Sequence, residues 1–275
     1  MSERDRTRNA EELVQLIYGT WSPFWGFYAK ANPAALWEET REATLCSFGL
    51  PHPLFNQVVE FAPDISSETV DRVCDRMNAL GLPWFWFGNP STWHESIPPR
   101  ALERGLVPVT SVKGMVFDSA KRSINTQPPI GLEVHEVQDK AGVDAFANGI
   151  LPAYEMPVEF ASYFSVAHER LGFYPQVPVR SFYGVWEGRP VTGSMVFFVE
   201  NTAVIQCVAT HPEARGHGFA QAVVSACMQA AKAEGYRYIV LQASDMGYPV
   251  YLKMGYEELF DQPVYMIPPS EEATP

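Results

Sequence analysis

AVIQCVATHPEARGHGFAQAVVSACMQAAKAEG, residues 203–235, is the stretch of sequence that decides the fold of this chain. It begins with an apolar run typical of a buried strand, and Pro212 marks the turn that follows. Apolar side chains then recur at steps of three and four residues, which predicts a helix with one buried face, closed by Gly235. The residues of that face are Phe219, Val223, Val224, Cys227, Ala230 and Ala231. The stretch therefore predicts a strand–loop–helix unit of an α/β protein.

A loop with two glycines, Gly216 and Gly218, joins the predicted strand to the predicted helix. The N-terminus of a helix carries unpaired N–H groups and a partial positive charge, so it attracts anions. Glycine has no Cβ and lets the backbone approach a phosphate closely. The P-loop pattern requires Lys-Ser or Lys-Thr after the glycines, and the dinucleotide pattern requires a third glycine where Gln221 stands. The loop therefore predicts a phosphate-bearing ligand of another kind.

Two motifs in this part of the chain resemble the GNAT superfamily of acyl-CoA N-acyltransferases. The loop reads Arg215-x-x-Gly218-x-Ala220, which is similar to the (Gln/Arg)-x-x-Gly-x-(Gly/Ala) signature of that family. Further along, YLKMGY, residues 251–256, matches its Tyr-x-x-x-Gly-(Phe/Tyr) pattern. The resemblance covers roughly residues 131–268 and implies acyl transfer from acetyl-CoA as co-substrate, without a metal.

The resemblance also implies roles for individual residues. The backbone at the end of the strand would pair with the pantetheine arm of acetyl-CoA and polarise the thioester carbonyl, at Val208, Ala209 and Thr210. The loop and the start of the helix would bind the pyrophosphate, at Arg215, Gly216, His217, Gly218, Phe219 and Ala220. Tyr251 would give a proton to the departing thiolate. Ser244 stands where many members have an asparagine that contacts the coenzyme, so this contact is a departure from the pattern.

The general base is a second departure from the family pattern. Some members keep a carboxylate in the strand, but residues 203–210 contain no Asp or Glu. Proton removal from an amine would then fall to Glu155, Glu159, His211 or a chain of water molecules. We favour Glu155, because it lies in the Pro-broken helical segment that resembles the acceptor-covering part of the family. His217 is expected at the surface near the phosphate rather than as a base.

The first half of the chain repeats the order of elements found in the second. A helix over residues 67–80, a strand at 83–87, a short helix near 99–104 and a strand at 112–117 follow the order of residues 221–267. We therefore expect an α/β (α+β) fold with two GNAT-like mixed-sheet domains in tandem. An unrelated α/β accessory domain is the alternative for the first half.

The expected domains are residues 1–125, a degenerate GNAT-like domain, and residues 126–275, the acetyl-CoA-binding catalytic domain. Their boundary falls in KRSINTQPPIG, residues 121–131, whose charges, asparagine and prolines suit a linker. Residues 61–65 carry no Arg-x-x-Gly-x-Ala motif, so the first domain is expected to lack a coenzyme site. Residues 1–16 look like a frayed polar lead-in, and the aromatic residues 21–28 are expected to pack in a core or between domains rather than line a substrate pocket.

Composition excludes several classes of protein. The formal net charge is −12, which disfavours a nucleic-acid binder. Residues 1–130 carry 12 basic and 15 acidic side chains and residues 131–275 carry 8 and 17, net charges of −3 and −9. An acidic second half must hold an anionic coenzyme through local donors. No long apolar stretch predicts a membrane span, and four scattered cysteines predict reduced thiols in a cytoplasmic protein.

Together these features predict an N-acetyltransferase that transfers an acetyl group to a small-molecule amine by direct attack within a ternary complex. A non-catalytic acyl-CoA-binding or sensor protein is one alternative, and a peptide or protein N-acetyltransferase is another. A homodimer is an assembly that the sequence allows.

Overall fold

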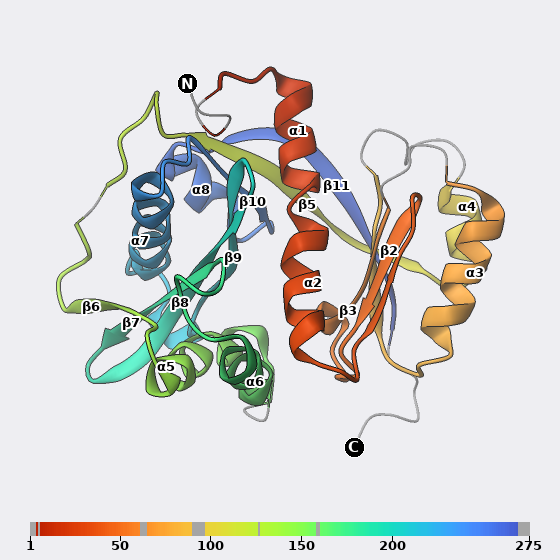
Figure 1. The fold of residues 1–275 in the computed structure, drawn as a ribbon, viewed down its shortest axis with the longest axis horizontal. Helices are drawn as coiled ribbons and strands as arrows, with labels where there is room; N and C mark the ends of the chain where they lie inside the picture. Colours follow the sequence, from red (N-terminus) through yellow and green to blue (C-terminus); the bar gives the residue numbers. More distant parts are fainter. Residues whose placement is uncertain are drawn as a thin grey trace. The chain divides into compact units, whose positions relative to one another are not determined.

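The computed structural model describes residues 4, 6–60, 65–89, 97–125, 127–157 and 160–268 (Figure 1). The chain forms two compact units: unit 1 comprises Met1–Thr20 and Met115–Leu259, and unit 2 comprises Trp21–Gly114 and Phe260–Pro275. The chain passes between them after Thr20 and within two long strands, β5 (Val107–Asp118) and β11 (Glu257–Ile267). This division differs from the single boundary expected after residue 125, because two strands each contribute to both units.

Unit 1 is built on a mixed sheet with the strand order β6-β7-β8-β9-β10-β5-β11. Its remaining strands are β6 (Leu132–Glu136), β7 (Val179–Trp186), β8 (Arg189–Val199), β9 (Thr202–Thr210) and β10 (Tyr238–Ala243). Neighbours from β6 to β9 are antiparallel, whereas β9 and β10 are parallel. Its helices and 3₁₀ turns are α1 (Ala10–Tyr18), α5 (Lys140–Ile150), η3 (Leu151–Tyr154), α6 (Ala161–Leu171), η5 (Pro212–Ala214), α7 (Phe219–Ala233) and α8 (Tyr248–Met254).

Helices α5 and α7 cover opposite faces of this sheet. Successive residues of a strand point to opposite faces. At Gly193 of β8 an added Cβ would collide with the side chain of Ile150 on α5, so α5 packs closely there. The next residue, Ser194, accepts a hydrogen bond from the Cys227 thiol of α7 at 3.4 Å. The predicted face of α7 is confirmed as buried, and Gly235 follows the helix end with φ of +81°.

Unit 2 has the strand order β1-β2-β3-β4-β11-β5. Its own strands are β1 (Leu36–Glu39), β2 (Ala43–Ser47), β3 (Asn56–Glu60) and β4 (Trp84–Phe87), and its helices and 3₁₀ turn are α2 (Trp21–Ala31), η2 (Pro53–Phe55), α3 (Ser67–Asn78) and α4 (Ile97–Glu103). Val70, Val73 and Met77 of α3 are buried against Trp84 and Trp86 of β4 in one apolar cluster. The period of three and four residues read from the sequence therefore marks the core face of this helix.

The two units repeat one order of elements. In each, antiparallel pairs, three in unit 1 and two in unit 2, are followed by a parallel pair, β9 with β10 in unit 1 and β3 with β4 in unit 2. A helix joins the members of the parallel pair, α7 in one unit and α3 in the other, and a short helix then leads to a long strand. The predicted fold class, two mixed-sheet α/β domains in tandem, is confirmed.

The beginning of the chain corrects one expectation. Residues 10–18 are not a frayed lead-in but helix α1, which starts at a capping box between Asn9 and Glu12. Ile17 is buried, so the helix is amphipathic and the polar residues that suggested fraying form its outer side. The aromatic stretch is helix α2, whose Trp21, Phe24 and Tyr28 are buried, which agrees with a packing role for this stretch.

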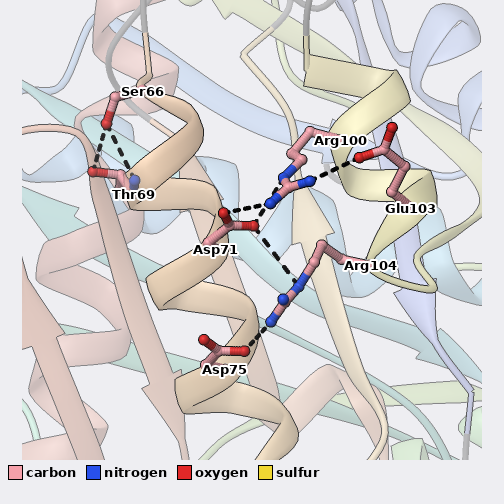
Figure 2. Close-up of polar contacts among 7 residues, drawn as sticks. All are labelled: Ser66, Thr69, Asp71, Asp75, Arg100, Glu103 and Arg104. Carbon is pink, nitrogen blue, oxygen red and sulfur yellow. Dashed lines mark hydrogen bonds and ion pairs between the residues drawn. The ribbon is translucent and has the colours of Figure 1, made fainter.

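Ion pairs join α3 to α4 in unit 2 (Figure 2). Arg100 donates to both carboxylate oxygens of Asp71, from Nε at 2.9 Å and from Nη2 at 2.6 Å. Arg100 also reaches Glu103 at 2.8 Å, and Arg104 pairs with Asp75 on the next turn of α3. Figure 2 shows Asp71 between the two guanidinium groups, which makes it the shared anion of the cluster. The cluster fixes the packing of α4 on α3.

We expect Asp71→Asn to lower the melting temperature by a few degrees at neutral pH. The hydrogen bonds from Arg100 hold the pKa of Asp71 below its usual value of 3.8. Its contribution to stability is therefore complete above that value and is lost as the pH falls through the lower pKa of the folded state. Melting curves should show the gap between wild type and variant closing below pH 3.8. Asp245→Asn, at an exposed carboxylate, is the control; equal melting temperatures for both variants at neutral pH would contradict the assignment.

Candidate functional site

A cavity of about 570 Å³ lies in unit 1, where the end of β9, the start of α7 and helix α8 meet. All but two of the residues predicted for the site line it; the exceptions are Glu155 and His217. The lining residues are Ala153, Tyr154, Val208, Ala209, Thr210, Ala214, Arg215, Gly216, Gly218, Phe219, Ala220, Gln221, Ser244, Met246, Gly247, Val250, Tyr251 and Lys253. Segments about a hundred residues apart in the sequence thus form one site.

The end of β9 presents backbone to this cavity. Strand β10 pairs with β9 at Ala203 and Val204, near the beginning of β9, whereas the far end pairs with β8. The register on β8 shifts between Gly193 and Met195, so Cys207 and the residue after it stand opposite a single residue. Cys207 has φ of +54°, an uncommon conformation for a residue with a side chain, and this marks a β-bulge. Bulges re-aim the groups that follow them, here toward the cavity.

Side-chain donors hold the carbonyl groups that follow the bulge. Tyr154 Oη donates to the carbonyl oxygen of Val208 at 3.2 Å. Thr192 Oγ1, on β8, donates to the carbonyl oxygen of Ala209 at 2.8 Å. The strand end is therefore fixed from η3 on one side and from β8 on the other.

The start of α7 is open. Gly216 and Gly218 have φ of +83° and +78°, which glycine adopts readily and other residues do not. Helices α1, α3 and α5 begin with side-chain caps from Asn9, Ser66 and Asp139. In the described structure no side chain caps α7, whose N-cap residue is Gly218. Its first N–H groups therefore face the cavity with the positive end of the helix dipole, which suits an anion.

Arg215 ties this loop to its surroundings. Its Nε donates to the carbonyl oxygen of Thr210 at 3.2 Å, and its Nη2 lies 3.5 Å from the carbonyl oxygen of Ala153. The side chain is exposed, so the guanidinium also has donors free to face a ligand phosphate. Arg215 thus joins β9, η3 and the glycine loop at the mouth of the cavity.

His217 lies on the other side of the loop. Its ring contacts Trp186 and Phe219, with centroids 5.3 Å from each. It lines a second cavity of about 580 Å³, between residues 123–125 and 127–130 on one side and α7 on the other, that shares Gly218, Gln221 and Lys253 with the first. His217 therefore lies beside the glycine loop and lines the second cavity, whereas Tyr251 lines the first.

Tyr251 of α8 forms the inner wall. Its side chain is 7 % exposed and packs edge-on against Tyr256, with ring centroids 5.7 Å apart. Gly247 allows this position, because an added Cβ there would lie 2.9 Å from the Tyr251 ring. Ser244 Oγ accepts from the Gly247 N–H at 3.3 Å and so fixes the turn before the helix. Burial raises the pKa of Tyr251, so its hydroxyl stays protonated through the neutral range.

The predicted base has no place in the cavity wall. Glu155 is exposed and follows η3 with φ of 55°. Glu159 lies outside the described residues, and His211 faces Glu213, with 3.8 Å between Nδ1 and Oε1. The sequence reading instead missed Tyr154, which stands beside Glu155. Only its position in the predicted acceptor segment hinted at it, since the contact with Val208 joins residues 54 positions apart.

Unit 2 has a different arrangement at the corresponding helix. Ser66 Oγ accepts from the Thr69 N–H at 3.1 Å, which satisfies the start of α3 (Figure 2). The expectation that residues 61–65 hold no coenzyme loop concerns a segment of which only Ile65 is described. A self-capped helix offers fewer free N–H groups to an anion than α7 does.

Two observations hold for the described part of the chain. None of its helices has the length and apolar character needed to cross a membrane. Its His, Cys, Asp and Glu side chains form no group of three or more that is placed to hold a metal ion.

Comparison with known proteins gives one family and several similar folds. The model of the Acetyltransferase (GNAT) family matches residues 148–256, which include every residue that lines the first cavity. A GCN5-related N-acetyltransferase from Kribbella flavida superposes with a TM-score of 0.66 at 14% identity, covering 92% of this chain and 95% of that one. A GCN5-related N-acetyltransferase from Sphaerobacter thermophilus gives 0.60 at 13% identity, covering 84% and 81%. No curated protein matches the chain.

A tandem GNAT protein from the clavulanic acid biosynthesis pathway gives a TM-score of 0.54 at 13% identity, covering 92% of this chain and 95% of that one. At these identities the likeness shows the fold alone. The coverage extends over both units, so the tandem order of elements is shared with solved structures.

We expect Gly216→Ala to weaken the binding of coenzyme A at least tenfold, about 1.4 kcal/mol, because its methyl group would stand where a phosphate approaches the backbone. Gly235→Ala is a matched control. Its φ is +81° against +83° at Gly216, and at both positions an added Cβ would meet no described atom within 4 Å.

Both substitutions should lower the free energy of unfolding by about 1–2 kcal/mol, the cost of a left-handed conformation for alanine. Titration calorimetry should separate them, since only Gly216→Ala changes the dissociation constant. Equal dissociation constants for the two variants would show that the loop does not hold the phosphates.

Proposed function

Residues 148–256 form a domain of the GNAT acetyltransferase family, and on that premise we propose that this protein transfers an acetyl group from acetyl-CoA to the amine of a small molecule. One observation carries the proposal. A single cavity brings together the bulged end of β9, the uncapped start of α7 and the buried phenol of Tyr251. The strand end suits the extended pantetheine arm, the helix start suits a diphosphate, and the phenol is a proton donor.

The residues present suit acetyl-CoA. The pyrophosphate would be held by N–H groups of the loop from Gly216 and by Arg215, since the acidic composition of this half leaves attraction to local donors. Lys253 of α8 lines both cavities. The pantetheine arm would follow the backbone of Val208, Ala209 and Thr210, which line the first cavity. The nucleotide end would extend toward the second cavity, beside His217.

The proposed reaction is direct attack of an unprotonated amine on the thioester carbonyl. A C–N bond forms and the C–S bond breaks, so the amine loses a proton and the thiolate gains one. Holding both reactants in one site replaces a bimolecular step, an effect that reaches effective molarities of about 10⁵ M. Backbone N–H groups at the strand end would polarise the carbonyl, and such donors contribute roughly 3 kcal/mol each.

Tyr251 would supply the proton to the thiolate. The apolar surroundings that raise the pKa of Tyr251 also favour the neutral form of a thiol beside it. The phenol therefore keeps its proton until a thiolate forms and then has a basic partner. Ser244 fixes the turn before α8 and so supports the position of Tyr251.

Glu155 is the proposed general base. Its exposed carboxylate would act on the acceptor only through water, and Glu155→Gln tests this through the rate of acetyl transfer. For unit 2 we propose that the copy binds no coenzyme, because Ser66 already caps the helix that corresponds to α7.

The test of the function is release of free thiol from acetyl-CoA in the presence of a panel of amines. We expect thiol release that depends on both acetyl-CoA and a small amine. Binding of acetyl-CoA without turnover on any amine would favour the non-catalytic sensor instead. Turnover confined to peptide amines would favour the peptide or protein N-acetyltransferase.

We expect Tyr251→Phe to lower kcat about a hundredfold, within the usual range for a general acid, with little change in coenzyme binding. Tyr248→Phe, on the same helix, is the control, because the Tyr248 hydroxyl bonds Glu258 at 2.6 Å instead. Since burial raises the pKa of Tyr251 above 10, its ionisation should not limit the wild-type rate between pH 7 and 9. An unchanged kcat in Tyr251→Phe would remove the proton-donor role.

A further inference from the structure

Tyr154 is held by a rigid turn beside the strand end. Its 3₁₀ turn, η3, begins at Leu151, which is 2 % exposed. The backbone N–H of Met156 donates to the carbonyl oxygen of Leu151 at 3.1 Å, and Arg215 reaches the carbonyl oxygen of Ala153. The turn closes through Glu155 in the left-handed conformation. These contacts fix where the Tyr154 ring can point.

The ring points at the bulge of β9. Its hydroxyl donates to the carbonyl oxygen of Val208 at 3.2 Å, next to the left-handed residue Cys207. Both Tyr154 and Val208 line the first cavity, so this hydrogen bond lies at the cavity wall. Burial, with Cys207 and Tyr251 as electrostatic neighbours, raises the pKa of Tyr154 well above 10. The hydroxyl therefore stays protonated near neutral pH. It can donate a hydrogen bond, and it does not act as a base.

The hydrogen bond from Tyr154 to Val208 constrains the backbone N–H of Val208 as well as its carbonyl group. In an extended strand, the N–H and C=O of one residue point to the same edge, which is why paired residues exchange both hydrogen bonds. Val208 belongs to strand β9, so holding its carbonyl group toward Tyr154 keeps its N–H on the same edge as long as the residue stays extended. A residue beside a bulge has no regular ladder to hold it, so a side-chain contact has to do this.

We propose that Tyr154 is a positioning residue of the acetyl-transfer site: by holding the Val208 carbonyl it aims the backbone N–H groups of the bulged strand end at the thioester. The catalytic part of this inference rests on the proposed function. Tyr154 does not exchange a proton with either substrate. Its effect passes through the backbone of Val208 and should appear in the rate of the chemical step rather than in coenzyme binding.

The first test uses the free protein. Amide hydrogen exchange of residues 207–209 should be about tenfold faster in Tyr154→Phe, which keeps the ring and removes the hydroxyl. Tyr183→Phe is the matched control, because Tyr183 is a half-buried tyrosine of β7 that stacks on His135. Unchanged exchange at residues 207–209 would overturn the inference, whether or not the protein is an enzyme.

The second test uses acetyl-CoA and an amine that the wild type accepts. We expect Tyr154→Phe to lower kcat about tenfold and to leave the dissociation constant of acetyl-CoA within about threefold of wild type. An unchanged kcat, or an effect on the dissociation constant alone, would overturn the positioning role. A wild type that releases no thiol would contradict the proposed function, and the exchange comparison would still decide whether Tyr154 holds the strand.

Discussion

The open N-terminus of α7 is the constraint on which the rest of the site depends. A helix start without a side-chain cap leaves N–H groups unpaired, and among the described residues no side chain satisfies those of α7. Gly216 and Gly218 bring the chain from β9 to that point in conformations that glycine tolerates. The acidic composition of this half makes such local donors the main attraction for an anion. The bulged end of β9 and the buried Tyr251 line the same cavity as this helix start.

The two units show how one order of elements gives two outcomes. In unit 1 the helix between the parallel strands begins with glycine, and a cavity opens in front of it. In unit 2 the corresponding helix has Ser66 as its N-cap, whose hydroxyl accepts from the Thr69 N–H, and an Arg100–Asp71 pair fixes its packing against α4. In the N-terminal copy, the residues at the start of this helix therefore stabilise the fold of unit 2. This difference is the basis for proposing a coenzyme site in unit 1 and none in unit 2.

Local patterns predicted most of this structure, and long-range contacts were the part that the sequence concealed. The strand, loop and helix of residues 203–235 follow from apolar period and glycine placement, which are properties of neighbouring residues. Helix α1 was missed because its polar outer side outweighed a short apolar face that includes the buried Ile17. Tyr154 was missed because its hydrogen bond to Val208 depends on how η3 packs against β9, which no local pattern encodes. The division into units differs from the single boundary expected after residue 125, because β5 and β11 each contribute to both units.

The central claim is that the free N–H groups of α7 and its glycine loop bind the diphosphate of acetyl-CoA. Hydrogen exchange measured with and without acetyl-CoA tests it most directly, because both helix starts report in one experiment. The account predicts slower exchange at residues 216–221 on addition of acetyl-CoA, and unchanged exchange at residues 67–70 of the capped helix α3. Protection at residues 67–70, or none at residues 216–221 with acetyl-CoA bound, would contradict it.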